Sequence, residues 1–215
     1  MSFTKKCLAT AVAASTMAFG AVAPVANAEV SGSVGIASSY LFRGVDLGPG
    51  TPAVWGDLSY SNSGFYGGVW ASSGDTTAGT EYDVYVGYSN EIGDFSYDIG
   101  VVNYVYPEVA DGGDFGDFSE AYLSLGYGPV SFSYYDNIAG ATGYEYYSLS
   151  ATFGAFSALI GLNDNEDDDA DDPVHLDVSY AYNDNLSFTL SQQIADEAET
   201  DDLKFVVGYS IPIGE

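Results

Sequence analysis

The feature of this sequence that most constrains its fold is a run of short segments in which apolar and polar residues alternate. About twelve such segments follow one another from Glu29 onward, and the connections between them are alternately long and short. Alternation with a period of two is typical of a β-strand with one apolar face. The alternation of long and short connections is typical of a transmembrane β-barrel, in which short periplasmic turns alternate with longer external loops.

The connections form two sets that alternate along the chain. The short set is 62–64, 90–93, 128–129, 154–155 and 183–185. The long set is 44–51, 74–79, 107–117, 136–143, 163–173 and 195–201. We therefore expect an all-β fold, a transmembrane antiparallel up-and-down β-barrel of about twelve strands.

The N-terminus has the pattern of an export signal. Lys5 and Lys6 precede an apolar stretch over 7–25, and Ala26-Asn27-Ala28 is a small-residue cleavage pattern. We expect a cleaved signal peptide over 1–28 and a single outer-membrane β-barrel domain over 29–215; the alternative is a buried or membrane-spanning N-terminal helix. Cleavage would remove Cys7, the only cysteine, so disulfides are not expected.

Charge restricts the partners. The chain carries −27, or −29 without Lys5 and Lys6, and only Arg43 and Lys204 are then basic. Nucleic acid is not an expected partner, because phosphate binding needs basic patches. Outer-membrane lipid and small solutes or cations are the expected partners. The acidity also suits a salt-rich environment.

Little in the sequence supports catalysis or metal binding. With one histidine and no cysteine in the mature chain, we expect no enzyme, cofactor or metal cluster. His175, Asp177 and Ser179 share a strand face, but His175 and Ser179 would be about 13 Å apart. A hydrolase would need a serine from a neighbouring strand.

Strand faces can be assigned from the alternation. Over 81–88, Tyr82, Val84 and Val86 point one way, and Glu81 and Asp83 the other. A soluble β-sandwich would show the same alternation. Three features favour the barrel: aromatic residues at the ends of the apolar sets, an even strand count and the alternating connection lengths.

Strand direction then places charges at one mouth. With the N-terminus periplasmic, even-numbered strands begin near the outside. Acidic residues near such starts are expected to point inward as channel-lining or constriction residues: Glu81, Asp83, Glu120, Glu145 and Asp177. Arg43 would end the first strand and Lys204 begin the twelfth, so the two would meet on one wall of this constriction.

Carboxylates in a pore favour cations over anions. The alternative is a narrow barrel filled by side chains such as Trp70, Tyr85 and Tyr122, in which Arg43 and Lys204 neutralise neighbouring acids. The acidic run over 164–172 lacks the ligand spacing of an EF-hand, and we expect a solvated loop rather than a specific calcium site. Diffuse binding of divalent ions that bridge to lipid phosphate is the alternative there.

An ordered set of motifs covers the first half of the chain after residue 28. They are Ser39-Tyr40-Leu41-Phe42-Arg43-Gly44-Val45, Pro52-Ala53-Val54, Gly64-Phe65-Tyr66-Gly67-Gly68-Val69-Trp70-Ala71-Ser72, Glu81-Tyr82-Asp83-Val84-Tyr85, Tyr97-Asp98-Ile99-Gly100, Tyr104-Val105-Tyr106-Pro107 and Glu120-Ala121-Tyr122. This set resembles the opening signature of the TorF family of Gram-negative bacteria, whose members are regarded as porins.

The resemblance implies an outer-membrane location and a channel of undefined substrate, and it carries no catalytic residues. The arginine of its signature is Arg43. One departure is the ending over 211–215, where outer-membrane barrels commonly have a terminal aromatic residue.

We thus expect an outer-membrane porin-like channel for passive diffusion of small solutes, with cation preference. The alternatives are a non-conducting structural or adhesin-like barrel, and an exported soluble β-sandwich that binds a ligand.

Overall fold

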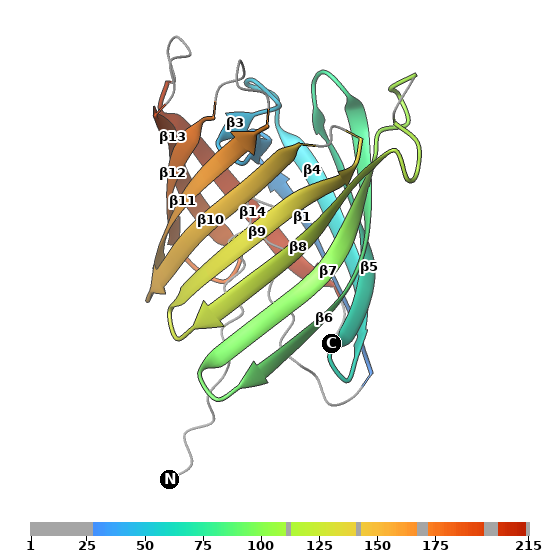
Figure 1. Ribbon diagram of the computed structural model, residues 1–215. Coiled ribbons are helices and arrows are strands. Elements are labelled where there is room, and N and C mark those ends of the chain that lie inside the picture. Colours follow the sequence, from blue (N-terminus) through green and yellow to red (C-terminus); the bar gives the residue numbers. More distant parts are fainter. Residues whose placement is uncertain (1–27, 111–112, 141–142, 167–171, 196–201, 214–215) are drawn as a thin grey trace.

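Twelve antiparallel strands close into one barrel in the computed structural model, which describes residues 28–110, 113–140, 143–166, 172–195 and 202–213 (Figure 1). The barrel strands are β1 (Glu29–Ala37), β4 (Ala53–Asn62), β5 (Phe65–Asp75), β6 (Gly79–Ile92), β7 (Phe95–Val105), β8 (Phe118–Tyr127), β9 (Val130–Ala139), β10 (Tyr144–Phe153), β11 (Phe156–Asn165), β12 (Val174–Ala181), β13 (Leu186–Ala195) and β14 (Lys204–Ile213). Two short strands, β2 (Leu41–Phe42) and β3 (Val45–Asp46), form a separate hairpin.

Closure is completed by β1, which pairs with β14 on one side and with β4 on the other. The expected barrel and strand number are confirmed, and the sandwich alternative is wrong because the strands form one closed sheet. The predicted signal peptide lies outside the described residues but for Ala28. No helix in the described part of the chain is long and apolar enough to cross a membrane.

The two ends of the barrel differ as the connection lengths predict. Tight turns join β4 to β5, β6 to β7, β8 to β9, β10 to β11 and β12 to β13 at the lower end of Figure 1. In the first of these turns, Ser63 and Gly64 have φ values of 53° and 89°. Positive φ at both central residues is the geometry of a two-residue hairpin whose twist matches the flanking strands. The other end carries the longer loops.

The outer face of the barrel is apolar. On β6, Tyr82, Val84 and Val86 are 40–61% exposed. Large aromatic residues surround the end with the tight turns: Tyr60, Phe65, Phe95, Tyr127, Phe153, Phe156 and Tyr182. An apolar band bordered by aromatic residues is typical of barrels that sit in a lipid bilayer.

The inner face is unevenly filled. On the wall formed by β5 to β8, large side chains lie flat over inward glycines. A Cβ at Gly100 would come within 2.3 Å of the Tyr122 hydroxyl, and one at Gly68 within 2.4 Å of the Tyr85 hydroxyl. The Tyr85 hydroxyl donates to Asp57 at 2.6 Å. Glycine at these inward positions therefore lets tyrosines occupy the space beside this wall.

Candidate channel constriction

The connection from β1 to β4 folds back into the barrel and carries the β2–β3 hairpin. Its turn consists of Arg43 and Gly44, with φ values of 47° and 81°. Arg43 is only 4% exposed, although the connection belongs to the end with the longer loops. Figure 1 shows the hairpin inside the rim at that end. The first loop thus supplies a segment that occupies the lumen.

The guanidinium of Arg43 crosses to the far wall. Its Nη1 donates to Glu120 Oε1 at 2.8 Å and its Nη2 donates to Glu120 Oε2 at 2.7 Å. A bidentate hydrogen bond of this kind fixes the orientation of the guanidinium and also pairs its charge. Burial, the largest single influence, lowers the pKa of the Arg43 guanidinium, but the Glu120 carboxylate and the phenols of Tyr104 and Tyr144 together raise it, and the net pKa lies well above its usual value.

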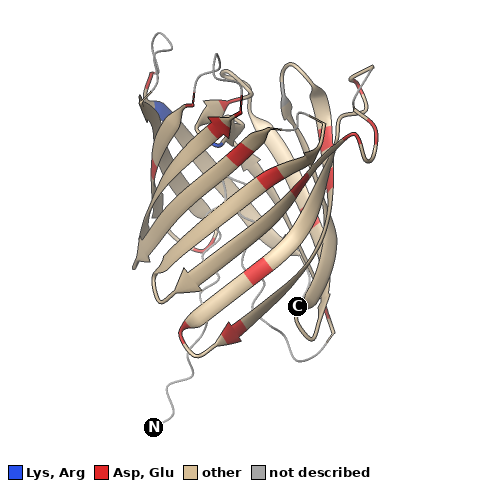
Figure 2. Ribbon diagram, in the orientation of Figure 1, with Lys and Arg blue, Asp and Glu red and all other residues tan. Residues whose placement is uncertain are grey.

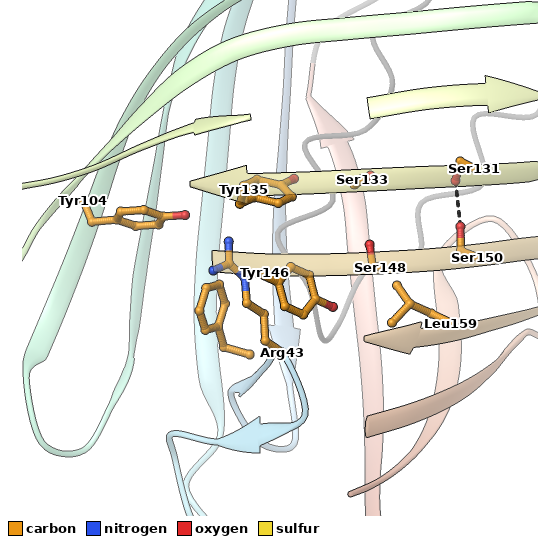
Figure 3. Close-up of a pocket in the computed structure, with 10 residues that line it drawn as sticks. Arg43, Tyr104, Ser131, Ser133, Tyr135, Tyr146, Ser148, Ser150 and Leu159 are labelled. Carbon is orange, nitrogen blue, oxygen red and sulfur yellow. Dashed lines mark hydrogen bonds between the residues drawn. The ribbon is translucent and has the colours of Figure 1, made fainter. Parts of the chain in front are cut away.

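Aromatic rings surround the same guanidinium. Its Cζ lies 4.7 Å from the ring centres of Phe42 and Tyr135, and 4.5 Å from that of Tyr146. Cations are attracted to the faces of such rings, more strongly where water is excluded. Figure 3 shows Arg43 pointing between Tyr135, Tyr146 and Tyr104. The charge is therefore held by an ion pair and by ring contacts together.

Other contacts attach the hairpin connection to β1, β14 and β6. Leu41 is buried with Ala37 and Val206, against β1 and β14. The Tyr40 hydroxyl donates to Glu81 on β6 at 2.7 Å. Burial and the Glu81 carboxylate raise the pKa of the Tyr40 phenol well above its usual value.

Contacts of the backbone hold the tip of the hairpin in place. The side-chain amide of Asn163 donates to the carbonyl oxygen of Arg43 at 3.3 Å. A Cβ at Gly44 would lie 2.5 Å from the Cβ of His175, so only glycine seats the turn against β12. The hairpin is thus joined to walls on several sides of the lumen.

Four of the five predicted acidic residues point inward, namely Glu81, Asp83, Glu120 and Asp177. All are buried, with exposed fractions of 0–4%. Asp177 bonds the Nδ1 atom of His175 at 3.2 Å, and the Nε2 atom of His175 bonds the Tyr146 hydroxyl at 3.0 Å.

Glu145 was expected to point inward, and this is wrong. Its neighbours Tyr144 and Tyr146 contact Arg43 in the lumen, so Glu145 faces outward. There it accepts hydrogen bonds from Tyr134, at 2.6 Å, and from Tyr147. It is therefore not part of the inner surface.

The expected meeting of Arg43 and Lys204 on one wall is also wrong. Strand β1 ends at Ala37, so Arg43 is not on a barrel strand. Lys204 remains on β14, in register with the buried Ser191, and thus faces inward. Figure 2 shows the basic segments at the end with the longer loops and the acidic ones spread around the barrel. Both basic residues are near one mouth, but only Arg43 crosses it.

Beneath the guanidinium lies a cavity of about 110 Å³. A water molecule takes about 30 Å³ in the liquid, so the cavity is large enough for a few waters. One wall is a double row of hydroxyls on β9 and β10, in which Ser131 and Ser150 share a hydrogen bond of 2.7 Å (Figure 3). Its lining consists of Phe42, Arg43, Tyr104, Tyr135, Tyr146, Leu159 and the serines Ser131, Ser133, Ser148 and Ser150.

The hairpin and the tyrosines that hold it were not predicted from the sequence. The available signal was Gly44 between the apolar pair Leu41-Phe42 and Val45, because glycine readily supplies the positive φ of a two-residue turn. Tyr40, Tyr104 and Tyr144 could not be paired with Arg43 or the acids, since their partners lie on distant strands.

Of the acidic run over 164–172, the structure describes residues 164–166 and 172, and residues 167–171 lie outside the described residues. The backbone N–H of Asn165 donates to Asp172 at 2.8 Å. Among the residues that the structure describes, no three His, Cys, Asp or Glu side chains form a group able to hold a metal ion.

Known proteins that resemble this chain provide a family but no activity. A family model described as "Bacterial protein of unknown function (Gcw_chp)" matches residues 21–166. No curated protein matches the sequence. Among solved structures, a KdgM porin is similar with a TM-score of 0.49 and 10% identity, over 86% of this chain and 98% of that one. Outer membrane phospholipase A from Escherichia coli is similar with a TM-score of 0.44 and 9% identity, over 84% and 88% of the two chains.

Proposed function

The chain belongs to the Gcw_chp family of bacterial proteins of unknown function, and we propose that it is an outer-membrane, porin-like channel for passive diffusion of small solutes, with a preference for cations. The closed barrel and its exposed apolar band support the membrane location, because only helices and closed barrels satisfy their backbone groups in lipid. The resemblance of the motifs to the TorF family stays a prediction, since the family model that matches is Gcw_chp, and it agrees with the same location.

The observation that carries the cation preference is the excess of inward carboxylates. Arg43 and Lys204 are the only Arg and Lys of the strands and hairpin, and Arg43 is already paired with Glu120. Rings of carboxylates raise the local cation concentration and repel anions. The inward acidic residues are Asp57, Glu81, Asp83, Asp98, Glu120 and Asp177. Cations therefore meet an attractive potential in this lumen.

Planar-bilayer recording tests the proposal. The purified barrel is inserted into a neutral bilayer under a KCl gradient, and the zero-current potential is measured. We expect unitary steps with a zero-current potential displaced towards that of potassium. Steps that reverse at the chloride potential would contradict the cation preference.

A second candidate, the non-conducting barrel, is favoured by the hairpin itself. It crosses the lumen with buried contacts, and Phe42 and Arg43 of the hairpin close one side of the cavity of about 110 Å³. The two candidates separate when wild type and Arg43→Ala are recorded side by side. If neither shows unitary steps across repeated insertions, the protein is a structural barrel and the channel proposal fails.

A hydrolase is not proposed. Both ring nitrogens of His175 have partners, Tyr146 and Asp177, and neither is a serine. The hydroxyl of Ser179 bonds Thr189 at 2.9 Å. The arrangement of nucleophile beside base that such chemistry needs is not formed by these residues.

A further inference from the structure

Asp83 on β6 is a carboxylate without a partner. It is completely buried, and in the described part of the chain neither of its oxygens has a hydrogen-bond partner. A buried polar group without a partner calls for an explanation, such as an ion or a water that occupies the site. An ionised carboxylate in this position is especially costly unless a positive charge lies beside it.

The neighbouring acids are already satisfied. Glu81 accepts from the hydroxyls of Tyr40, at 2.7 Å, and Tyr106, at 2.9 Å. Glu120 has the guanidinium of Arg43 on both oxygens, and a further bond from Tyr104 at 2.7 Å. These four donors, Tyr40, Tyr106, Arg43 and Tyr104, are thus directed at the two glutamates.

The described residues offer no second cation at this place. Arg43 is the only arginine, and it is committed to Glu120. Lys204 is on β14, which β1, β4 and β5 separate from β6 around the barrel. The carboxylate of Asp83 nevertheless interacts electrostatically with those of Glu81 and Glu120. The one guanidinium among these three acids is paired with Glu120, so an ionised Asp83 needs another cation beside it.

The groups that interact electrostatically with this carboxylate carry oxygen atoms. Besides the two glutamates, the phenols of Tyr40 and Tyr104 lie within electrostatic range of it. Carboxylate and hydroxyl oxygens are hard ligands that suit hard cations. A calcium ion takes 6–8 oxygen ligands, usually with several carboxylates. No group of three acidic or histidine ligands is formed by the described residues. The geometry thus favours a cation of lower charge.

We propose that Asp83 holds a monovalent alkali cation inside the barrel, beside the inserted hairpin. Its carboxylate supplies the negative charge, and the hydroxyl oxygens of Tyr40 and Tyr104 replace part of the hydration shell. The site deepens the proposed function and rests on it in one respect: in a conducting barrel this cation is an ion on its way through the lumen. Binding itself requires no conduction.

Thermal unfolding in matched salts tests the site. The detergent-solubilised barrel is heated in NaCl, in KCl and in choline chloride at equal ionic strength, because choline is too large to enter. We expect a higher unfolding midpoint in the two alkali salts for wild type. Asp83→Asn should abolish this difference, because the amide keeps the shape but not the charge.

The matched control is Asp98→Asn. Asp98 is also a buried, inward acid, but it accepts a hydrogen bond from Tyr66. It should keep the difference between alkali and choline salts. An equal midpoint for wild type in all three salts overturns the site, and so does a difference that survives in Asp83→Asn.

Two further measurements keep the test independent of the variant's folding. Equilibrium binding of radioactive rubidium to wild type should show one ion per barrel that sodium displaces and choline does not. No retained rubidium overturns the site. A proton is the rival occupant of the site. If infrared spectroscopy at neutral pH shows a band of a protonated carboxyl that Asp83→Asn removes, Asp83 is neutral. That result also overturns the proposed cation site.

Failure of the site and failure of the channel are distinguishable. Salt-specific stabilisation and rubidium binding are read in detergent, without current. A barrel that binds rubidium but shows no unitary steps keeps the site and loses the channel. A barrel that conducts without salt-specific stabilisation keeps the channel and loses the site.

Discussion

Arg43 and Glu120 join the tip of an inserted hairpin to the far wall of the barrel through two parallel hydrogen bonds of 2.8 and 2.7 Å. Both side chains are almost fully buried, at 4% and 1% exposed. Removing one partner of a buried ion pair typically costs about 3–5 kcal/mol, because the other charge stays buried alone. This pair therefore has the largest expected share in holding the hairpin inside the lumen.

Replacement of Arg43 by Ala should release the hairpin. With Glu120 left unpaired, the seated state loses about 3–5 kcal/mol, and the lumen opens for a larger fraction of the time. We expect a higher unitary conductance and a stronger cation preference in planar bilayers. Lys204→Ala is the control for charge: it also removes one inward positive charge, but from the wall, so it should raise the cation preference without opening the lumen. An unaltered conductance and ion preference in Arg43→Ala would remove Arg43 from the constriction.

The double variant Arg43→Ala, Glu120→Gln should lose less stability than the sum of the losses in the two single variants. The substituted amide is neutral, so no buried charge remains after the arginine is removed. We expect a coupling energy on the order of 1–3 kcal/mol from urea unfolding of the folded barrel. Strict additivity of the two changes would mean that the ion pair does not contribute to stability.

Gly44→Ala should unseat the hairpin turn. The position has a φ of 81°, and its Cβ would lie 2.5 Å from that of His175. The left-handed conformation costs a non-glycine residue about 1–2 kcal/mol, and the clash adds to it. Gly50→Ala is the matched control, with a φ of 68° and open space around its Cβ. We expect raised conductance in bilayers from the first variant only; equal behaviour of both would exclude the contact with His175 as the cause.

Glu145→Gln should leave the zero-current potential of the channel unchanged, because the side chain is on the outer face with Tyr134 and Tyr147. Asp177→Asn should lower the cation preference, because Asp177 faces the lumen. Both changes remove one negative charge from a barrel strand, so their comparison under a KCl gradient isolates the direction of the side chain. A larger shift from Glu145→Gln than from Asp177→Asn would contradict the assigned faces.

The strand faces could be predicted wherever one side of the strand is apolar and the other polar. On β6, Tyr82, Val84 and Val86 alternate with Glu81 and Asp83, and the predicted directions are correct. On β10 the sequence Tyr144-Glu145-Tyr146-Tyr147 has aromatic residues on both faces. A shift of one residue exchanges the two faces of a strand, and nothing in this segment determines the phase.

The hairpin was harder to predict because it resembles a continuation of the first strand. Tyr40, Leu41 and Phe42 have the apolar character of a strand end, and the chain was expected to run on to Arg43. In the structure β1 ends at Ala37, and Leu41 packs against Ala37 and Val206. This packing involves β14, far along the chain, so no local pattern reveals it.

Period-two alternation, turn lengths and composition were enough to predict the barrel, its approximate strand number, the end that carries the longer loops and the negative character of the interior. All of these signals are local or additive along the chain. Three other properties could be read only from the folded barrel: Arg43 crosses the lumen to Glu120, Glu145 faces outward, and Asp83 is left without a partner among the described residues. They depend on which distant strands face one another across the lumen, and only closure of the sheet brings those strands together.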